Sequence, residues 1–176
     1  MTIIESPPAA ATDPGAAVER ATARVLELAR TWLAWDGRPR VSDEGDRVYT
    51  PHKAIRRYGD HLIDHLAEVE ARLAGVSSRP HGWHGSLITL QSDSARFTEA
   101  DLVEARERLS RLSRTFRLRL LTAGEERWDL PQAGAWTLRE VADHVGSPWY
   151  AEQLGDLRWQ AHRRASRAQG CPQGSL

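Results

Sequence analysis

The sequence predicts an all-α protein folded as a four-helix bundle. Four helix-start signals each precede an apolar stripe of helical period, and almost no segment alternates polar and apolar residues as a strand does. The chain has 176 residues, which suits a single domain. We expect the bundle over residues 14–167, between a disordered N-terminal arm (1–13) and a disordered tail (168–176). Its helices are expected at residues 14–36, 51–74, 98–123 and 138–166.

A capping residue followed by a proline predicts the start of each of the first two helices. Asp13 and Thr50 are residue types that cap a helix N-terminus, and the proline that follows each suits the first helical position. Gly37 and Gly75 mark the two C-terminal ends. The apolar positions recur at helical spacing, namely Val18, Val25, Ala29, Trp32 and Leu33, then Ile55, Leu62, Leu66, Val69 and Leu73.

The last two helices begin at capping boxes. Thr98 pairs with Asp101, and Thr137 pairs with Glu140, each three residues further on. We expect a kink in the fourth helix at residues 146–148 (Gly-Ser-Pro), because proline lacks an N–H group and crowds the preceding turn. The apolar stripes are Leu102, Leu109, Leu112, Phe116 and Leu120, then Val141, Val145, Tyr150, Leu154 and Leu157.

The connection between the second and third helices is long. It covers residues 76–97, and loops of that length without structure of their own usually have a function or cover other parts of a protein. The segment contains PHGWHG, with two histidines, and SLITL, which is compatible with a short extended piece. We therefore expect a covering or functional connection here.

Composition excludes several classes of protein. Lys plus Arg and Asp plus Glu number 24 each, so the basic excess of a nucleic-acid-binding protein is missing. One cysteine, Cys171, excludes an internal disulfide and a cysteine-rich zinc cluster. The chain has neither an apolar run of about 18 residues nor the pattern of a secretory signal at its start. We expect a cytoplasmic protein without nucleic-acid or membrane partners.

Two histidines in the segment DHLIDH suggest a metal site. His61 and His65 are four residues apart, so they share a helix face with Cβ atoms about 5–6 Å apart. That spacing suits a metal ion held by two imidazoles, and it also suits an ordinary polar stripe. Tyr58 and Glu68 lie on the same stripe, next to the apolar one. Polar groups that border a core are costly unless they are paired or ligated, which favours the metal interpretation.

A third histidine can complete the site. His144 lies about 10 Å along the fourth helix, and His61 about 15 Å along the second. These two helices are parallel in an up-down-up-down bundle, so the three rings would meet. His81 and His84, in the long connection, are rival ligands.

Further residues are candidates for supporting roles. Asp64 follows His61 by three residues and can accept a hydrogen bond from a ligating imidazole. Tyr58 and Glu68 are candidates for a catalytic acid or base, although core packing and a surface ion pair are simpler interpretations. The aromatic residues expected near the site, as pocket walls, are Trp83, Trp136, Trp149 and Tyr150.

Two segments resemble the DinB/YfiT-like superfamily. WTLREVADHV, residues 136–145, is similar to its signature of a tryptophan, a Ser/Thr cap, a leucine, an acidic residue and a histidine on the second turn. DHLIDHLAEVEARL is similar to the superfamily's H-x-x-x-H helix. The two motif helices stand in reversed order here, because the H-x-x-x-H helix comes first. The resemblance covers these two helices well and the other two only by type.

The resemblance implies a fold, a metal site and a chemistry. Members are four-helix bundles with a long crossover connection, and many bind a divalent metal through three histidines, which correspond to His61, His65 and His144. The superfamily includes thiol-dependent transferases and isomerases that use mycothiol or bacillithiol. We thus expect zinc or nickel, a low-molecular-weight thiol, a small-molecule substrate, a homodimer, and transferase, isomerase or hydrolase activity. The alternative is a non-catalytic binding or dimerising bundle that has lost the metal.

Overall fold

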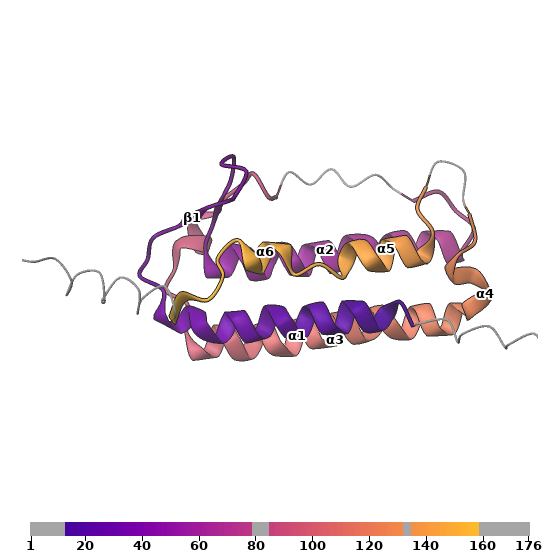
Figure 1. Cartoon of the computed structure of the whole chain (residues 1–176), viewed down its shortest axis with the longest axis horizontal. Helices are drawn as coiled ribbons and strands as arrows, with labels where there is room; N and C mark the ends of the chain where they lie inside the picture. Colours follow the sequence, from indigo (N-terminus) through magenta and orange to yellow (C-terminus); the bar gives the residue numbers. More distant parts are fainter. Residues whose placement is uncertain (1–12, 79–84, 132–134, 159–176) are drawn as a thin grey trace, which may run out of the picture.

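The computed structural model describes residues 13–78, 85–131 and 135–158, and the fold is mostly helical (Figure 1). Three long helices dominate it: α1 (Gly15–Thr31), α2 (Pro51–Leu73) and α3 (Glu99–Ala123). The shorter helices and strands are η1 (Trp32–Ala34), β1 (Arg40–Val41), β2 (Val48–Tyr49), η2 (Gln91–Ser94), α4 (Glu125–Trp128), α5 (Leu138–Val145) and α6 (Trp149–Glu152). In the described part of the chain, no helix is long and apolar enough to cross a bilayer.

The helices form two layers. In Figure 1, α1 and α3 lie side by side in one layer, and α2 lies beside α5 and α6 in the other. The expected apolar stripes meet between the layers as one hydrophobic core, which confirms them. Its largest fully buried aliphatic and aromatic side chains are Trp32, Trp128, Tyr49, Tyr58, Phe116, Leu62, Leu109, Leu120 and Leu154.

Three of the four helix-start signals act as the sequence predicts. At the first, Pro14 and not Asp13 is the N-cap of α1, and the Asp13 carboxylate accepts a hydrogen bond from the Gly15 N–H. The Thr50 hydroxyl accepts a hydrogen bond from the Lys53 N–H at 3.2 Å, with Pro51 in the first helical position. Thr98 and Thr137 head reciprocal capping boxes with Asp101 and Glu140. The starts of α2, α3 and α5 are therefore encoded locally.

The expected up-down-up-down order is wrong. In Figure 1, α2 and α3 run in the same direction, and α5 runs antiparallel to α2. Side-chain contacts agree: Arg119 of α3 pairs with Glu70 near the end of α2, while His52 near the start of α2 packs on Phe97 just before α3. The connection between α2 and α3 is thus a crossover, and part of its described segment 85–94 contacts Lys53, Arg56 and Arg57 of α2.

The prediction of one kinked but continuous fourth helix over residues 138–166 is also wrong. It is divided into α5 and α6, and α6 ends at Glu152. The division falls at the expected kink, because Pro148 cannot donate a backbone hydrogen bond to the preceding turn. Gly155 then adopts a positive φ of 63°, and its carbonyl accepts a hydrogen bond from the Trp32 indole at 3.0 Å. The turn at Gly155 therefore ties the chain back to α1.

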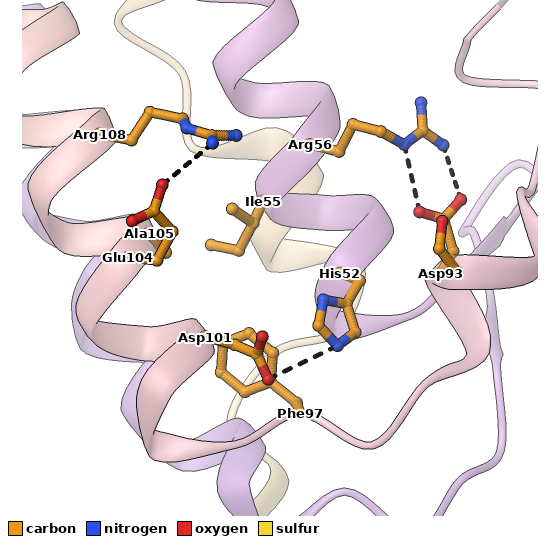
Figure 2. A pocket seen from close by; sticks show the side chains of 10 residues that line it. His52, Ile55, Arg56, Asp93, Phe97, Asp101, Glu104, Ala105 and Arg108 are labelled. Carbon is orange, nitrogen blue, oxygen red and sulfur yellow. Dashed lines mark hydrogen bonds and ion pairs between the residues drawn. The ribbon is translucent and has the colours of Figure 1, made fainter.

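Two connections differ from expectation in detail. The polar segment after η1 forms the antiparallel β1–β2 pair around a turn at Gly45, whose φ is 77°. The segment SLITL (86–90) forms no strand and leads into η2. Asp93 of η2 binds Arg56 of α2 by two hydrogen bonds, which attach the crossover to α2 (Figure 2).

Candidate metal centre

Three histidines from two helices meet in the layer that α2, α5 and α6 form. His61 and His65 lie one turn apart on α2, and His144 lies on α5. One ring nitrogen from each lies within 4.8 Å of the other two. The ring centroids are 4.6 Å apart for His61–His65, 4.8 Å for His61–His144 and 5.0 Å for His65–His144. The structure therefore brings together the residues that the spacing and the resemblance select.

The antiparallel arrangement of α2 and α5 still brings the rings together. His65 lies eight residues before Leu73, the last residue of α2, and His144 lies six residues after Leu138, the first of α5. These offsets correspond to about 12 Å and about 9 Å of helix, measured from the same end of the pair. The two heights therefore nearly agree although the helices run antiparallel.

Glu68 orients one of the three imidazoles. His65 is buried, with 8% of its surface exposed, and its Nδ1 lies 2.8 Å from Oε2 of Glu68. A carboxylate only accepts hydrogen bonds, so Nδ1–H donates and Nε2 remains as the possible ligand atom. Arg72 also donates to Glu68, which holds that carboxylate in place. Glu68, predicted as a possible acid or base, lies in the structure as the hydrogen-bond partner of a candidate ligand.

His144 has a lowered pKa. Burial of its ring, followed by the neighbouring His65, holds the pKa of His144 below the ordinary 6.5, against the opposing effect of Glu68. The residue is solvent-exposed on one side, but its ring packs 4.7 Å from the Trp136 ring. His144 is therefore neutral at neutral pH, as a metal ligand must be.

Two aromatic side chains form walls beside the histidines. Trp136 stacks on His65 at 6.3 Å, and Tyr150 meets His61 edge-on at 5.6 Å. Trp149 instead packs its ring on Tyr49, at 5.8 Å, and on Tyr150. Two of the four predicted wall residues thus contact the histidine rings directly.

Tyr58 is a core residue. It is fully buried, and its hydroxyl lies 3.0 Å from the Thr22 hydroxyl. Burial raises the pKa of Tyr58 to about 12, against the effect of the hydrogen bond with Thr22. A phenol with that pKa exchanges its proton poorly near neutral pH, so the geometry fits the packing interpretation.

We expect Tyr58→Phe to lower stability without affecting the metal site. The substitution removes one buried hydrogen bond and leaves Thr22 bonded to the Val18 carbonyl, so it should cost about 1 kcal/mol in urea unfolding. Metal affinity, measured on the same variant by titration, should equal that of the wild type. A variant with unchanged stability and weakened metal binding would instead place Tyr58 at the site.

The remaining site candidates from the sequence are Asp64, His81, His84 and Trp83. Asp64 is half-buried on α2, one turn from His61. His81, His84 and Trp83 lie outside the described residues. Sequence reasoning missed the Glu68–His65 bond, although the three-residue offset that selected Asp64 for His61 also selects Glu68 for His65.

A groove between the start of α2 and α3 is a separate feature (Figure 2). Its volume is about 230 Å³, and Ile55, Phe97 and Ala105 form its apolar part. Its charged side chains are already paired, as Arg56–Asp93, Arg108–Glu104 and His52–Asp101. Because these charged side chains already have partners, the histidine cluster is the better candidate for a functional site.

Comparison with known proteins gives no relative for the chain, since no family model, no curated protein and no solved structure matches it.

Proposed function

We propose that the chain is a divalent-metal-dependent enzyme of the DinB/YfiT-like type, built as a four-helix bundle, with His61, His65 and His144 as metal ligands. The observation that carries the proposal is the meeting of three imidazole nitrogens within 4.8 Å. The crossover between α2 and α3 supports it, because a long crossover is also what the resembled superfamily has.

The donor set fits a metal ion. Zinc bonds to imidazole are about 2.0–2.1 Å long, so nitrogens in a tetrahedral site lie about 3.3–3.5 Å apart. Side-chain rotations that bring the nitrogens closer by up to about 1.4 Å reach this geometry. Three protein ligands leave a coordination position for water or substrate, which is the arrangement of catalytic rather than structural sites.

The proposed chemistry uses this open position. A divalent ion held by three neutral imidazoles supplies Lewis acidity and lowers the pKa of a bound water or thiol. The protein's own groups set the conditions: Glu68 fixes the His65 ring, while Trp136 and Tyr150 shield two sides of the cluster. We propose a small-molecule substrate and a low-molecular-weight thiol as reaction partners, with zinc or nickel as the ion.

Metal analysis tests this function. Protein purified without a His-tag or a chelating column should contain about one equivalent of zinc or nickel per chain. The loaded protein should consume a low-molecular-weight thiol in the presence of an electrophilic small molecule, and the metal-free protein should not. A chain that neither retains nor takes up a divalent ion would favour the alternative, a non-catalytic binding bundle.

Glu68→Gln should weaken metal binding. Gln keeps the size of Glu68 but removes the carboxylate that accepts the His65 Nδ1–H bond, so we expect metal affinity to fall roughly 10–100-fold. Competition with a chromophoric chelator measures the change. Glu70→Gln is the matched control, since Glu70 lies on the same helix and pairs with Arg119 instead. Equal affinities for Glu68→Gln and the wild type would exclude this role.

Metal affinity should fall at acidic pH. Ligating imidazoles must be neutral, so protons compete with the ion once the pH falls below the ordinary histidine pKa of about 6.5. The lowered pKa of His144 delays protonation of that ligand to more acidic pH. We expect the apparent association constant to drop at least about tenfold between pH 7 and pH 5.5, measured by chelator competition. Affinity independent of pH over this interval would contradict histidine ligation.

A further inference from the structure

The histidines of α2 continue a line of basic residues. Lys53, Arg57, His61 and His65 follow one another at four-residue intervals, so they share one face of the helix. Arg57 is one turn, or about 6 Å, before His61, and Lys53 is one turn further. The described contacts along this line include β2, the segment 85–89 and α6, in addition to the histidine cluster.

Lys53 carries a buried charge without a carboxylate of its own. It is fully buried, and its ammonium donates to the Thr89 hydroxyl at 3.0 Å and lies 5.1 Å from the centre of the Tyr49 ring. No carboxylate oxygen lies within 4.0 Å of it among the residues that the structure describes. Burial lowers the pKa of Lys53, as expected when a cation leaves water without direct compensation.

The Arg57 guanidinium has a hydrogen-bond donor that is not used in the described structure. Its Nη1 donates to Asp60 at 3.0 Å and its Nε to the Ser86 hydroxyl at 3.3 Å, whereas Nη2 has no hydrogen-bond acceptor within the described segments. The side chain is 6% exposed, and the backbone of Gly85 lies so close that a Cβ there would be 2.7 Å from Nη1. The guanidinium is therefore held in one position with a donor unused.

The charges around this point do not balance. Lys53, Arg56 and Arg57 supply three positive charges, and the two adjacent carboxylates, Asp60 and Asp93, supply two negative ones. Asp93 is committed to Arg56, so Asp60 alone serves Arg57. Among the residues that the structure describes, one positive charge thus lacks a carboxylate partner in a largely buried place, and burying such a charge is costly unless an anion joins it.

Tyr150 connects this basic group with the histidines. The Arg57 guanidinium lies 5.6 Å from the centre of the Tyr150 ring, and the His61 ring lies 5.6 Å from the same centre. A small molecule lying along Tyr150 can therefore present one end to the histidines and the other to Arg57. Guanidinium groups suit such a position because they bind carboxylates and phosphoryl groups with directed hydrogen bonds.

We propose that Arg57 and Lys53 form an anion subsite of the same centre, and that its substrates carry a carboxylate or phosphoryl group with an oxygen about 6 Å from the atom that reacts at the histidines. This inference names the substrate class of the proposed metal site and rests on that function. It leaves Tyr150 as the surface along which the substrate lies.

The subsite is tested first without metal. Succinate is added to the metal-free, ¹⁵N-labelled protein, and the Nε–Hε signal of Arg57 is followed. We expect a saturable shift, because a carboxylate binds the unused donor of the guanidinium. Absence of any saturable shift at Arg57 would overturn the anion subsite, whatever the metal content of the protein.

The link to the metal is tested with matched ligands. Succinate and butyrate both have four carbons, but only succinate has a second carboxylate. In the zinc-loaded protein we expect succinate to bind roughly tenfold more tightly than butyrate, since its two ends are bound at once. Equal affinities there would contradict the proposed span. A chain that binds succinate at Arg57 but no zinc would overturn the proposed function and leave an independent anion site.

Variants distinguish specific binding at the anion subsite from a general effect of positive charge on succinate affinity. Arg57→Lys and, independently, Lys53→Met should each weaken succinate roughly tenfold while zinc stoichiometry and the melting temperature show that the site and the fold persist. Arg56→Lys is the matched control, because Arg56 is adjacent but committed to Asp93. Should Arg57→Lys fail to fold, Lys53→Met alone decides. Unchanged succinate binding in the folded variants, or an equal loss in Arg56→Lys, would overturn the assignment.

Discussion

His61→Ala, His65→Ala and His144→Ala should each abolish stoichiometric metal binding. The three nitrogens form one cluster within 4.8 Å, and removal of any one leaves two imidazoles, which hold a divalent ion much less tightly than three. We expect about one equivalent of metal per wild-type chain and well below about 0.2 equivalents per variant after dialysis against a weak chelator. Elemental analysis of the dialysed proteins measures this.

Controls separate ligation from a general effect on the histidines. His52→Ala removes a histidine of α2 that packs on Phe97 and is not part of the cluster. His81→Ala and His84→Ala remove the histidines of the crossover. All three should retain full metal. Loss of metal in His81→Ala or His84→Ala, with retention in His144→Ala, would move the third ligand from α5 to the crossover.

Asp93→Asn should destabilise the fold strongly. Asp93 is 2% exposed and accepts hydrogen bonds from Arg56 Nε at 3.1 Å, Arg56 Nη2 at 2.7 Å and the Leu90 N–H at 2.7 Å. Asn keeps the volume but not the charge, so Arg56 loses its bidentate partner and keeps only the longer contact with Asp60, at 3.8 Å. Removal of one partner of a buried ion pair costs about 3–5 kcal/mol, which urea unfolding at pH 7 measures.

The same pair predicts a pH dependence. Burial raises the pKa of Asp93, but hydrogen bonds from Arg56 and the Leu90 N–H lower it by more, so the folded-state pKa is below the ordinary value. A depressed carboxyl pKa stabilises the fold fully above the unfolded-state value of about 3.9, and this contribution is lost as the pH falls through the folded-state pKa. The difference between wild type and Asp93→Asn should therefore shrink in acid.

An exposed pair provides the matched control. Asp129 also binds one arginine, Arg139, by two hydrogen bonds, but its side chain is 62% exposed. Asp129→Asn should cost no more than about 1 kcal/mol, because water screens an exposed pair. Comparable losses in Asp93→Asn and Asp129→Asn would mean that burial of Asp93 adds nothing to the attachment of the crossover.

Local signals predicted much of this fold. Cap residues and apolar periodicity placed α2 and α3 to within one residue of their observed ends, because Thr50, Thr98 and Gly75 act through contacts a few residues away. The same periodicity predicted the shared face of His61 and His65. These features depend on the geometry of a single helix, which the spacing of residues specifies.

Features that depend on tertiary structure were not predictable in this way. The relative direction of α2 and α3 depends on the path of the crossover, which Arg56 and Asp93 fix through contacts 37 residues apart. The end of α6 at Glu152 depends on the turn at Gly155 and its bond to Trp32 on another element. Periodicity carries no information on such contacts, so a kinked continuous helix was the expected but wrong outcome.

The histidine site has features that the sequence predicts and features that depend on the tertiary structure. Its three ligand candidates follow from spacing and from the two motifs, even though the predicted parallel packing of their helices was wrong. The role of Glu68 required the structure, because only there does its carboxylate lie on His65 Nδ1. The basic residues Lys53 and Arg57 drew no attention in the sequence, since charge on a helix is usually solvated and their burial becomes visible only in the fold.

X-ray absorption spectroscopy of the zinc-loaded protein directly tests ligation by the three histidines. We expect three imidazole nitrogens at about 2.0–2.1 Å from the ion, with further light-atom scattering from a non-protein ligand. We also expect that any zinc taken up by His144→Ala at high concentration has fewer imidazole ligands. A spectrum that fits fewer than three imidazoles in the wild type, or one that His144→Ala leaves unchanged, would contradict the three-histidine metal centre.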